Sequence, residues 1–388
     1  MIALYFHIPY CIRKCRYCDF CSVPVNESAS RYCDALQIEI ALQKKRYPHE
    51  TASTVFFGGG TPTVLDAYAL CGVLEAANKA FPFASDAEIS IECNPGAASK
   101  QALKTLRKAG FNRLSIGLQS SDDTLLARIG RAHNYSDFLN IYTDAREAGF
   151  SNINVDLMHG LPTQTMAQYR KTLETVCDIG PEHISAYALI LEEGTPLYRD
   201  VTAGREVLPD ADDTADMQDA GIAYLASRGY FRYEISNFAK RGHECRHNLT
   251  YWNNGPYLGF GAAAHSSMGA GARWERFSNV ESIPQYLRAL ERGRLPEAER
   301  IVINTFEQMF ETIMLGLRLV RGVDLAAFEQ RFGCALAETY PEAIAKNRAR
   351  GLWDESDPRF LRLNERGLDL LNSVLLDFQE RNYWDLLR

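Results

Sequence analysis

Four cysteines within eleven residues are the sequence feature best suited to chemistry. They are Cys11, Cys15, Cys18 and Cys21, and they follow an apolar run that predicts a strand over 3–8. Cysteines four and three residues apart on one short loop can converge on one centre. Their soft thiolates favour an iron–sulfur cluster. Zinc more often takes two separated Cys-x₂-Cys pairs, and a zinc site or unligated thiols stay as the alternatives.

The number of suitably spaced cysteines bears on what such a cluster could do. Cys11, Cys15 and Cys18 would bind three irons and leave a fourth iron open to a substrate or cofactor. Cys21 falls outside this pattern, as a spare ligand or a partly exposed structural thiol. The other six of the ten cysteines are scattered along the chain, and we expect most of them to be small buried side chains.

Length and composition narrow the class of protein. The chain has 388 residues, 46% of them hydrophobic and 23% charged, which is typical of a globular protein with a sizeable core. The net charge of −7 argues against a protein that binds nucleic acid by neutralising phosphates. We see no secretory signal and no apolar run of membrane-spanning length. We therefore expect reduced thiols and a cytoplasmic location.

Alternating strand and helix patterns fill the first half of the chain. Strands are predicted over 3–8, 54–57, 88–92, 113–117, 152–157 and 183–189. Helices are predicted over 30–45, 66–80, 99–109, 136–148 and 165–178, with Ser99, Ser136 and Thr165 as N-caps. Repeated strand–helix units predict a parallel sheet with right-handed crossovers. Six units are fewer than the eight of a closed barrel, so we expect an α/β fold with an open, partial (β/α)6 barrel.

The pattern changes in the second half, and we divide the chain into three parts. The partial barrel covers 1–235, with a last strand near 233–237. A connecting segment over 236–300 is rich in Gly, His and aromatic residues. Residues 301–388 predict helix, helix, hairpin and helix, which is typical of a winged-helix-like domain. That last part carries 11 basic and 14 acidic residues, so packing or partner docking is favoured over DNA binding.

The cysteine spacing also carries a family resemblance. Cys-x₃-Cys-x₂-Cys, with Tyr17 before the last cysteine and a strand just before the loop, resembles the signature of the radical S-adenosylmethionine (SAM) superfamily. The resemblance implies a [4Fe-4S] cluster on Cys11, Cys15 and Cys18, with SAM on the open iron. Further stretches, at 7–11, 58–63, 89–95, 117–120 and 156–162, are similar to the HemN/HemW group of that superfamily.

The resemblance also implies which residues contact SAM. Several are polar residues at successive strand ends, where chemistry is assembled in parallel βα folds. The implied contacts are Tyr5, Tyr17, Gly59, Gly60, Thr61, Glu92, Gln119, Arg131, Asp156 and Ala188. Thr61 stands where other superfamily members carry an acid. For each polar residue alone, a structural hydrogen bond is the alternative, because buried polar groups need partners in any protein.

Two branches of the HemN/HemW group have different functions. One contains oxygen-independent coproporphyrinogen III dehydrogenases, which are radical SAM enzymes, and the other contains haem chaperones, so whether this chain is an enzyme stays open. Three features favour the chaperones: the chain begins at its first strand, Phe20 stands where the dehydrogenases have a fourth cysteine, and 247–252 reads His-Asn-x-x-Tyr-Trp. That last motif resembles the chaperone branch.

The segment after residue 240 has the chemistry to bind a porphyrin. Haem iron takes His or Cys ligands, and this segment contains His243, Cys245, His247 and His265. Its aromatic residues Tyr251, Trp252, Tyr257 and Phe260 offer flat faces, and Arg241, Arg246 and Arg273 offer cations for propionates. We take His247 as the candidate ligand. The alternative is that the aromatic residues pack a domain junction and His247 makes a structural hydrogen bond.

The resemblance also implies partners. Haem would be the cargo, and haemoproteins would be its recipients. A respiratory-chain recipient would bring the chain to a membrane surface through that partner, although no anchor is encoded. A homodimer is compatible with the sequence, and a nucleic-acid partner is not expected.

Overall fold

The computed structural model describes residues 1–270 and 273–385. All six predicted strands of the first half are present and form consecutive parallel pairs. They are β1 (Ile2–Ile8), β4 (Ala52–Gly59), β5 (Phe83–Cys93), β6 (Arg113–Gln119), β7 (Ile153–His159) and β8 (His183–Ala188). Strands of a parallel sheet that are covered on both faces are buried almost throughout, and every residue of β6 is buried.

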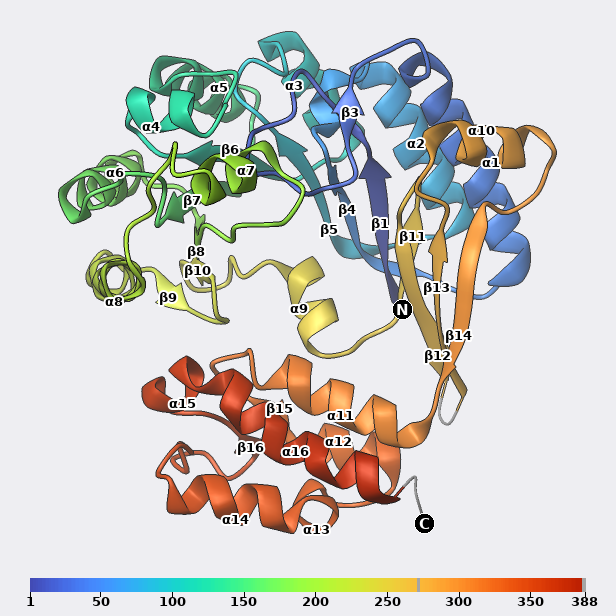
Figure 1. The fold of residues 1–388 in the computed structure, drawn as a ribbon. Helices are drawn as coiled ribbons and strands as arrows, with labels where there is room; N and C mark the ends of the chain where they lie inside the picture. The colour runs from blue at the N-terminus through green and yellow to red at the C-terminus, as the bar shows by residue number, and fades with distance from the viewer. Residues whose placement is uncertain (271–272, 386–388) are drawn as a thin grey trace.

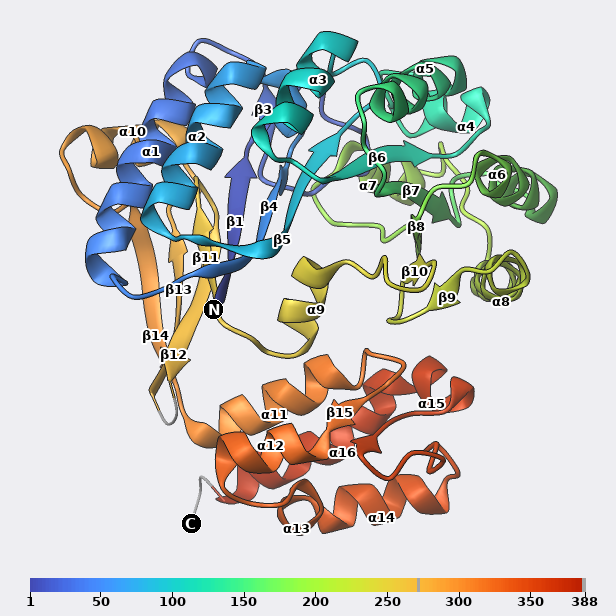
Figure 2. The ribbon, with the colours of Figure 1, turned by 180° about the vertical axis from the view of Figure 1, so that it is seen from behind.

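Helices cover the outer face of these six strands (Figures 1 and 2). They are α1 (Ala29–Arg46), α2 (Ala67–Ala80), α3 (Lys100–Ala109), α4 (Asp123–Arg128), α5 (Tyr135–Glu147) and α6 (Met166–Ile179). Ser99 and Thr165 cap α3 and α6 as predicted. Ser136 does not cap α5. Asn134 does, because its side chain accepts from Asp137 N while the Asp137 carboxylate accepts from Asn134 N.

The barrel is open, as predicted, and the sheet continues beyond both of its edges. β1 pairs in parallel with β11 (Tyr257–Phe260), and three antiparallel strands follow: β12 (His265–Ala270), β13 (Arg273–Asn279) and β14 (Glu297–Ile303). The segment over 236–300, which the sequence predicted to be a connection with a candidate haem site, thus supplies strands to the same sheet. Its apolar residues Met268, Phe277 and Tyr286 belong to the core of the barrel.

The other edge carries two short strands in place of the single strand predicted over 233–237. These are β9 (Phe231–Arg232) and β10 (Asn237–Ala239), of which β10 pairs with β8. The residues between them turn toward the C-terminal domain, where Glu234 forms a bridge with Leu319 and Val320 N donates to Tyr233 O at 3.0 Å. These contacts explain the interruption of the predicted strand.

A second core lies in the C-terminal domain, which Figure 1 shows below the sheet. Its helices are α11 (Thr305–Gly316), α12 (Leu325–Phe332), α13 (Leu336–Thr339), α14 (Pro341–Ala349), α15 (Glu365–Asp369) and α16 (Leu371–Asp385). The predicted hairpin reduces to a bridge between Trp353 and Leu363, because β16 (Phe360–Leu361) pairs with β15 (Val323–Asp324) instead. No helix in the described ranges has the length and apolar character to cross a membrane.

Candidate cluster and cofactor site

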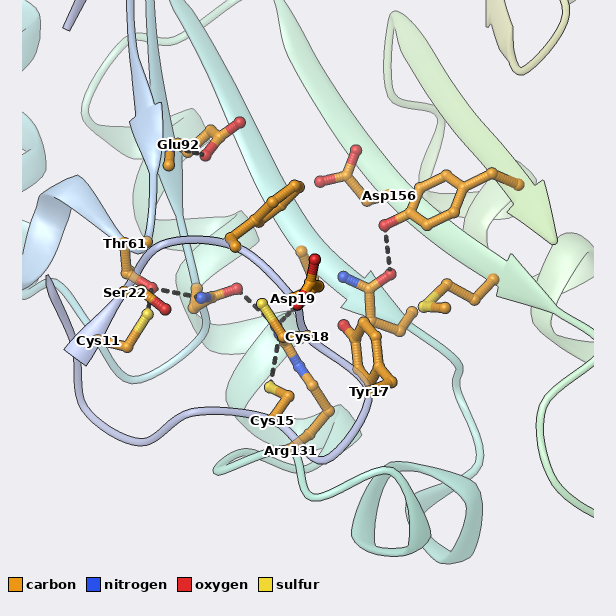
Figure 3. A pocket seen from close by; sticks show the side chains of 18 of the residues that line it. Cys11, Cys15, Tyr17, Cys18, Asp19, Ser22, Thr61, Glu92, Arg131 and Asp156 are labelled. Atoms are coloured by element: carbon orange, nitrogen blue, oxygen red, sulfur yellow. Dashed lines mark hydrogen bonds between the residues drawn. The ribbon is translucent and has the colours of Figure 1, made fainter. Parts of the chain in front are cut away.

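A cavity of about 530 Å³ opens at the carboxyl ends of the six parallel strands. Its size falls in the range of small-molecule sites, about 300–1,000 Å³. Figure 3 shows the cysteine loop on one side of it and the strand ends on the other. Twelve of the residues singled out from the sequence line this cavity: Cys11, Cys15, Tyr17, Cys18, Gly59, Gly60, Thr61, Glu92, Gln119, Arg131, Asp156 and Ala188. Tyr5 and His247 do not.

The cysteine loop runs between β2 (Tyr10–Cys11) and β3 (Val23–Pro24) and is anchored to the barrel. Arg16 lies in the middle of the loop, where its backbone N donates to Ile129 O at 3.0 Å and its guanidinium pairs with Asp200 and Glu206. These contacts hold the loop over the strand ends. Cys11, Cys15 and Cys18 reach the cavity, whereas Cys21 lies outside it, with its Sγ 3.7 Å from Glu281 O.

The cysteines are free thiols, and burial raises the pKa of Cys18. In the described part of the chain, no three Cys, His, Asp or Glu side chains gather closely enough to bind one metal ion. A [4Fe-4S] cluster does not require such a group, because each cysteine binds a different iron. The three cysteines that line the cavity are compatible with such a cluster.

A chain of hydrogen bonds joins two of these cysteines across the cavity floor. Thr61 Oγ1 donates to Cys11 Sγ at 3.5 Å, and Asn94 Nδ2 donates to Thr61 Oγ1 at 2.6 Å. Arg131 then donates to Asn94 Oδ1 at 2.5 Å and to Cys15 Sγ at 3.6 Å. The sequence analysis did not single out Asn94, although it lies within the stretch 89–95 that carries the resemblance.

Arg131 is a buried cation, and this bears directly on whether a cluster fits. Its side chain also donates to Gly117 O at 2.5 Å, and its Nε has no hydrogen-bond partner among residues 1–270 and 273–385. It forms no salt bridge with a carboxylate of any described residue. Burying an unpaired charge costs several kcal/mol. An anionic thiolate on Cys15, as in a cluster, would place a negative charge within hydrogen-bond distance of the guanidinium, so the residues of this cavity fit a [4Fe-4S] cluster.

Two half-buried carboxylates, Glu92 and Asp156, face the same cavity. Burial raises the pKa of Glu92 to about 8, with the neighbouring charge of Asp156 as the next cause. Burial also raises the pKa of Asp156, while a hydrogen bond from Asn154 at 2.7 Å opposes that shift. Gly59 N donates to Glu92 at 3.2 Å. A cationic ligand in the cavity would lower both pKa values, since it favours the charged carboxylates.

Packing explains the two glycines at the end of β4, Gly59 and Gly60, in addition to the SAM contact that the resemblance implies. Gly59 has φ of +106°, and a Cβ there would lie 2.6 Å from the His7 ring. A Cβ on Gly60 would lie 2.6 Å from Tyr10 O, which is backbone and cannot easily move. Because Tyr10 begins the short strand β2 that leads into the cysteine loop, the glycines let the end of β4 and the start of that loop approach each other.

Gln119 adopts a left-handed backbone, with φ of +74°. Such a conformation is uncommon for residues other than glycine and often marks a functional site. The Gln119 side chain accepts a hydrogen bond from Tyr187 OH at 3.1 Å. Tyr187 was not singled out from the sequence, and it lines the cavity beside Ala188.

Tyr5 and His247 line a separate, smaller cavity of about 210 Å³, which shares Glu92 and Asp156 with the larger one. His247 is 1% exposed. Its Nδ1 contacts Thr54 Oγ1 at 2.9 Å, and its Nε2 contacts Tyr251 OH at 2.8 Å. Both ring nitrogens are thus occupied. These contacts are those of the structural alternative, and the role of His247 as an iron ligand stays a prediction.

The other porphyrin candidates of this segment are mostly engaged in packing. Cys245 is buried 3.5 Å from Glu88, and Phe260 stacks on Phe6 with ring centroids 4.8 Å apart. Arg246 pairs with Asp86. Tyr251, Tyr257 and His265 instead line a third cavity, described below.

An open barrel of parallel strands with a cysteine-rich loop after its first strand defines a radical SAM protein. The Radical SAM superfamily model matches residues 5–176, and the HemN C-terminal domain model matches residues 306–370. The fold is similar to that of the Escherichia coli coproporphyrinogen III oxidase HemN, with a TM-score of 0.82 and 24% identity over 97% of this chain and 89% of that one.

Curated relatives are similar over nearly the whole chain. Heme chaperone HemW of Bacillus subtilis is 37% identical over 92% of this chain and 94% of its own. Heme chaperone HemW of Escherichia coli is 33% identical over 96% and 97%. A mitochondrial radical S-adenosyl methionine domain-containing protein 1 of Bos taurus is 35% identical over 98% and 87%. The chain belongs to the HemW family.

The buried position of His247 predicts a structural effect of its loss. His247→Ala should leave the buried hydroxyl of Thr54 without its partner, which costs roughly 1–3 kcal/mol, and should remove the hydrogen bond to the half-buried Tyr251. We expect a lower urea midpoint in unfolding followed by circular dichroism. His49→Ala, at an exposed position, is the control. An unchanged midpoint for His247→Ala would contradict the structural assignment.

The raised pKa of Glu92 predicts a pH-dependent stability for the cluster-free protein. Between pH 4.5 and about 8, the folded chain keeps a proton on Glu92 that the unfolded chain releases. Rising pH through this window therefore favours unfolding. Glu92→Gln does not titrate, so its melting temperature relative to the wild type should be higher at pH 8 than at pH 5. A difference independent of pH would refute the raised pKa.

Proposed function

We propose that this chain is a haem chaperone, which binds haem and delivers it to haemoproteins while carrying a [4Fe-4S] cluster and SAM. The observation that carries the proposal is the full-length similarity to proteins named heme chaperone HemW, at 33–37% identity over 92–96% of the chain in two bacteria. The fold alone does not choose this function, since it is shared with HemN.

Within this proposal, Cys11, Cys15 and Cys18 bind the cluster. Arg131 lies beside Cys15 and offsets the negative charge of the thiolate. When bound, the cluster offers SAM an open iron and can supply it with an electron. Glu92, at 3.2 Å from Gly59 N, is placed to receive the positive end of SAM. Gln119, Asp156 and the other cavity residues position the rest of the molecule.

Location and partners follow from the same proposal. A reduced cytoplasmic compartment suits an oxygen-sensitive cluster, and all ten cysteines are free thiols. The recipients we propose are haemoproteins, including those of a respiratory chain. A homodimer and contact with a membrane through such a partner are further parts of the proposal.

The second candidate function is oxygen-independent coproporphyrinogen III dehydrogenase, favoured by the similarity of the fold to HemN. A strain lacking that enzyme, grown without oxygen, separates the two functions. We expect this chain not to restore growth, whereas growth rescue would favour the enzyme. Haem titration of the purified protein, followed by its Soret band, tests the chaperone directly. Weak, unsaturable binding would refute it.

The cluster assignment predicts the effect of losing its cysteines. A variant with Cys11, Cys15 and Cys18 all changed to Ala should take up no [4Fe-4S] cluster on anaerobic reconstitution, because no thiolates remain to bind the irons. Iron analysis and the visible absorption spectrum measure this. Cys21→Ala is the matched control, since Cys21 lies on the same loop but outside the cavity. Unchanged iron content in the triple variant would contradict the assignment.

A further inference from the structure

A second large cavity, of about 540 Å³, lies where the barrel meets the C-terminal domain. We call it the interdomain cavity. One wall is formed by residues of β1, β11, β12 and β13, and the opposite wall by Glu311, Met314 and Leu315 of α11. Figures 1 and 2 both show α11 below the lower ends of these strands. Its size is again in the range of small-molecule sites.

The strand wall of this cavity follows the alternation of side chains in a sheet. Tyr257 on β11 pairs with Ser267 on β12, which pairs with Arg276 on β13, and all three line the cavity. His265 lies two residues before Ser267 and therefore points to the same side. The topology of the extended sheet thus brings an imidazole, a phenol ring and a guanidinium to one face.

His265 differs from His247, the histidine that we took from the sequence as the candidate iron ligand. Its side chain is exposed to the cavity, and its imidazole forms no hydrogen bond with any described residue. His247 is buried, and both its ring nitrogens are occupied. His7, in the same wall as His265, also uses both nitrogens, toward Tyr5 OH at 3.1 Å and Cys21 O at 2.9 Å.

The remaining walls suit a flat, largely apolar ligand. The rings of Tyr251 and Tyr257 lie edge to face, with centroids 4.7 Å apart, and Met314 and Leu315 face them from α11. Arg276 pairs with both oxygens of Glu311, at 2.9 and 3.0 Å, so one ion pair joins the two walls. Macrocycles such as haem combine an apolar plane with an iron that takes histidine ligands.

We propose that the interdomain cavity is the haem site and that His265 is an axial ligand of the haem iron. This inference rests on the proposed chaperone function, and it places the cargo apart from the cavity assigned to the cluster and SAM. His7 connects the two sites, because it lines the interdomain cavity and contacts the backbone of Cys21 in the cysteine loop.

Haem titration of variants tests this assignment. In the full-length protein, His265→Ala should raise the dissociation constant for haem by at least about tenfold, since even indirect partners of a metal ligand cost that much. It should also abolish the histidine-type Soret and electron paramagnetic resonance signals. Added imidazole should restore those signals by entering the space left by the side chain. Because His265 is exposed, the melting temperature should not change.

Control variants separate the possible failures. His49→Ala, an exposed histidine far from the cavity in sequence, should bind haem like the wild type. His247→Ala, corrected for its lower stability, should keep the histidine-type spectrum. If the wild type binds haem saturably and His265→Ala keeps the same affinity and spectrum, the site is wrong but the chaperone function stands. If the wild type itself shows no saturable binding, the proposed function fails.

Discussion

A buried cation that forms no salt bridge with any described carboxylate is the constraint on which the candidate cluster site depends. Arg131 donates to Asn94, to Gly117 O and to the sulfur of Cys15. Neutral acceptors alone compensate a buried charge poorly. The guanidinium therefore favours an anionic group beside Cys15, and a thiolate-bound cluster is such a group. The same interaction fixes the cysteine loop against β6 and, through Asn94 and Thr61, reaches Cys11.

The extended sheet places two cavities beside its first strand. The carboxyl ends of the parallel strands surround the cavity assigned to the cluster and SAM. Strands β11 to β13 and helix α11 enclose the interdomain cavity. His7 contributes to the wall of one and contacts the loop of the other. A chaperone whose cargo site borders its cluster loop has a direct physical route by which the cluster could affect haem binding.

The sequence predicted local features well and long-range contacts poorly. The six parallel strands and the cysteine loop followed from periodicity and spacing. The strands over 257–279 were missed because Gly, His and aromatic residues hide their alternation. Asn94 was missed because its role appears only when Arg131, 37 residues away, folds beside it. His247 was chosen for its residue type, but only the structure shows that Thr54 and Tyr251 occupy both of its nitrogens.

Haem transfer is the measurement that tests the central claim most directly. The cluster-reconstituted, haem-loaded protein would be mixed without oxygen with an apo-haemoprotein, and the Soret band of the recipient would be followed. The proposed function predicts that the recipient spectrum grows as the donor spectrum decays, faster than from free haem. Haem that stays on this chain, together with SAM-dependent decarboxylation of coproporphyrinogen III in a parallel assay, would contradict it.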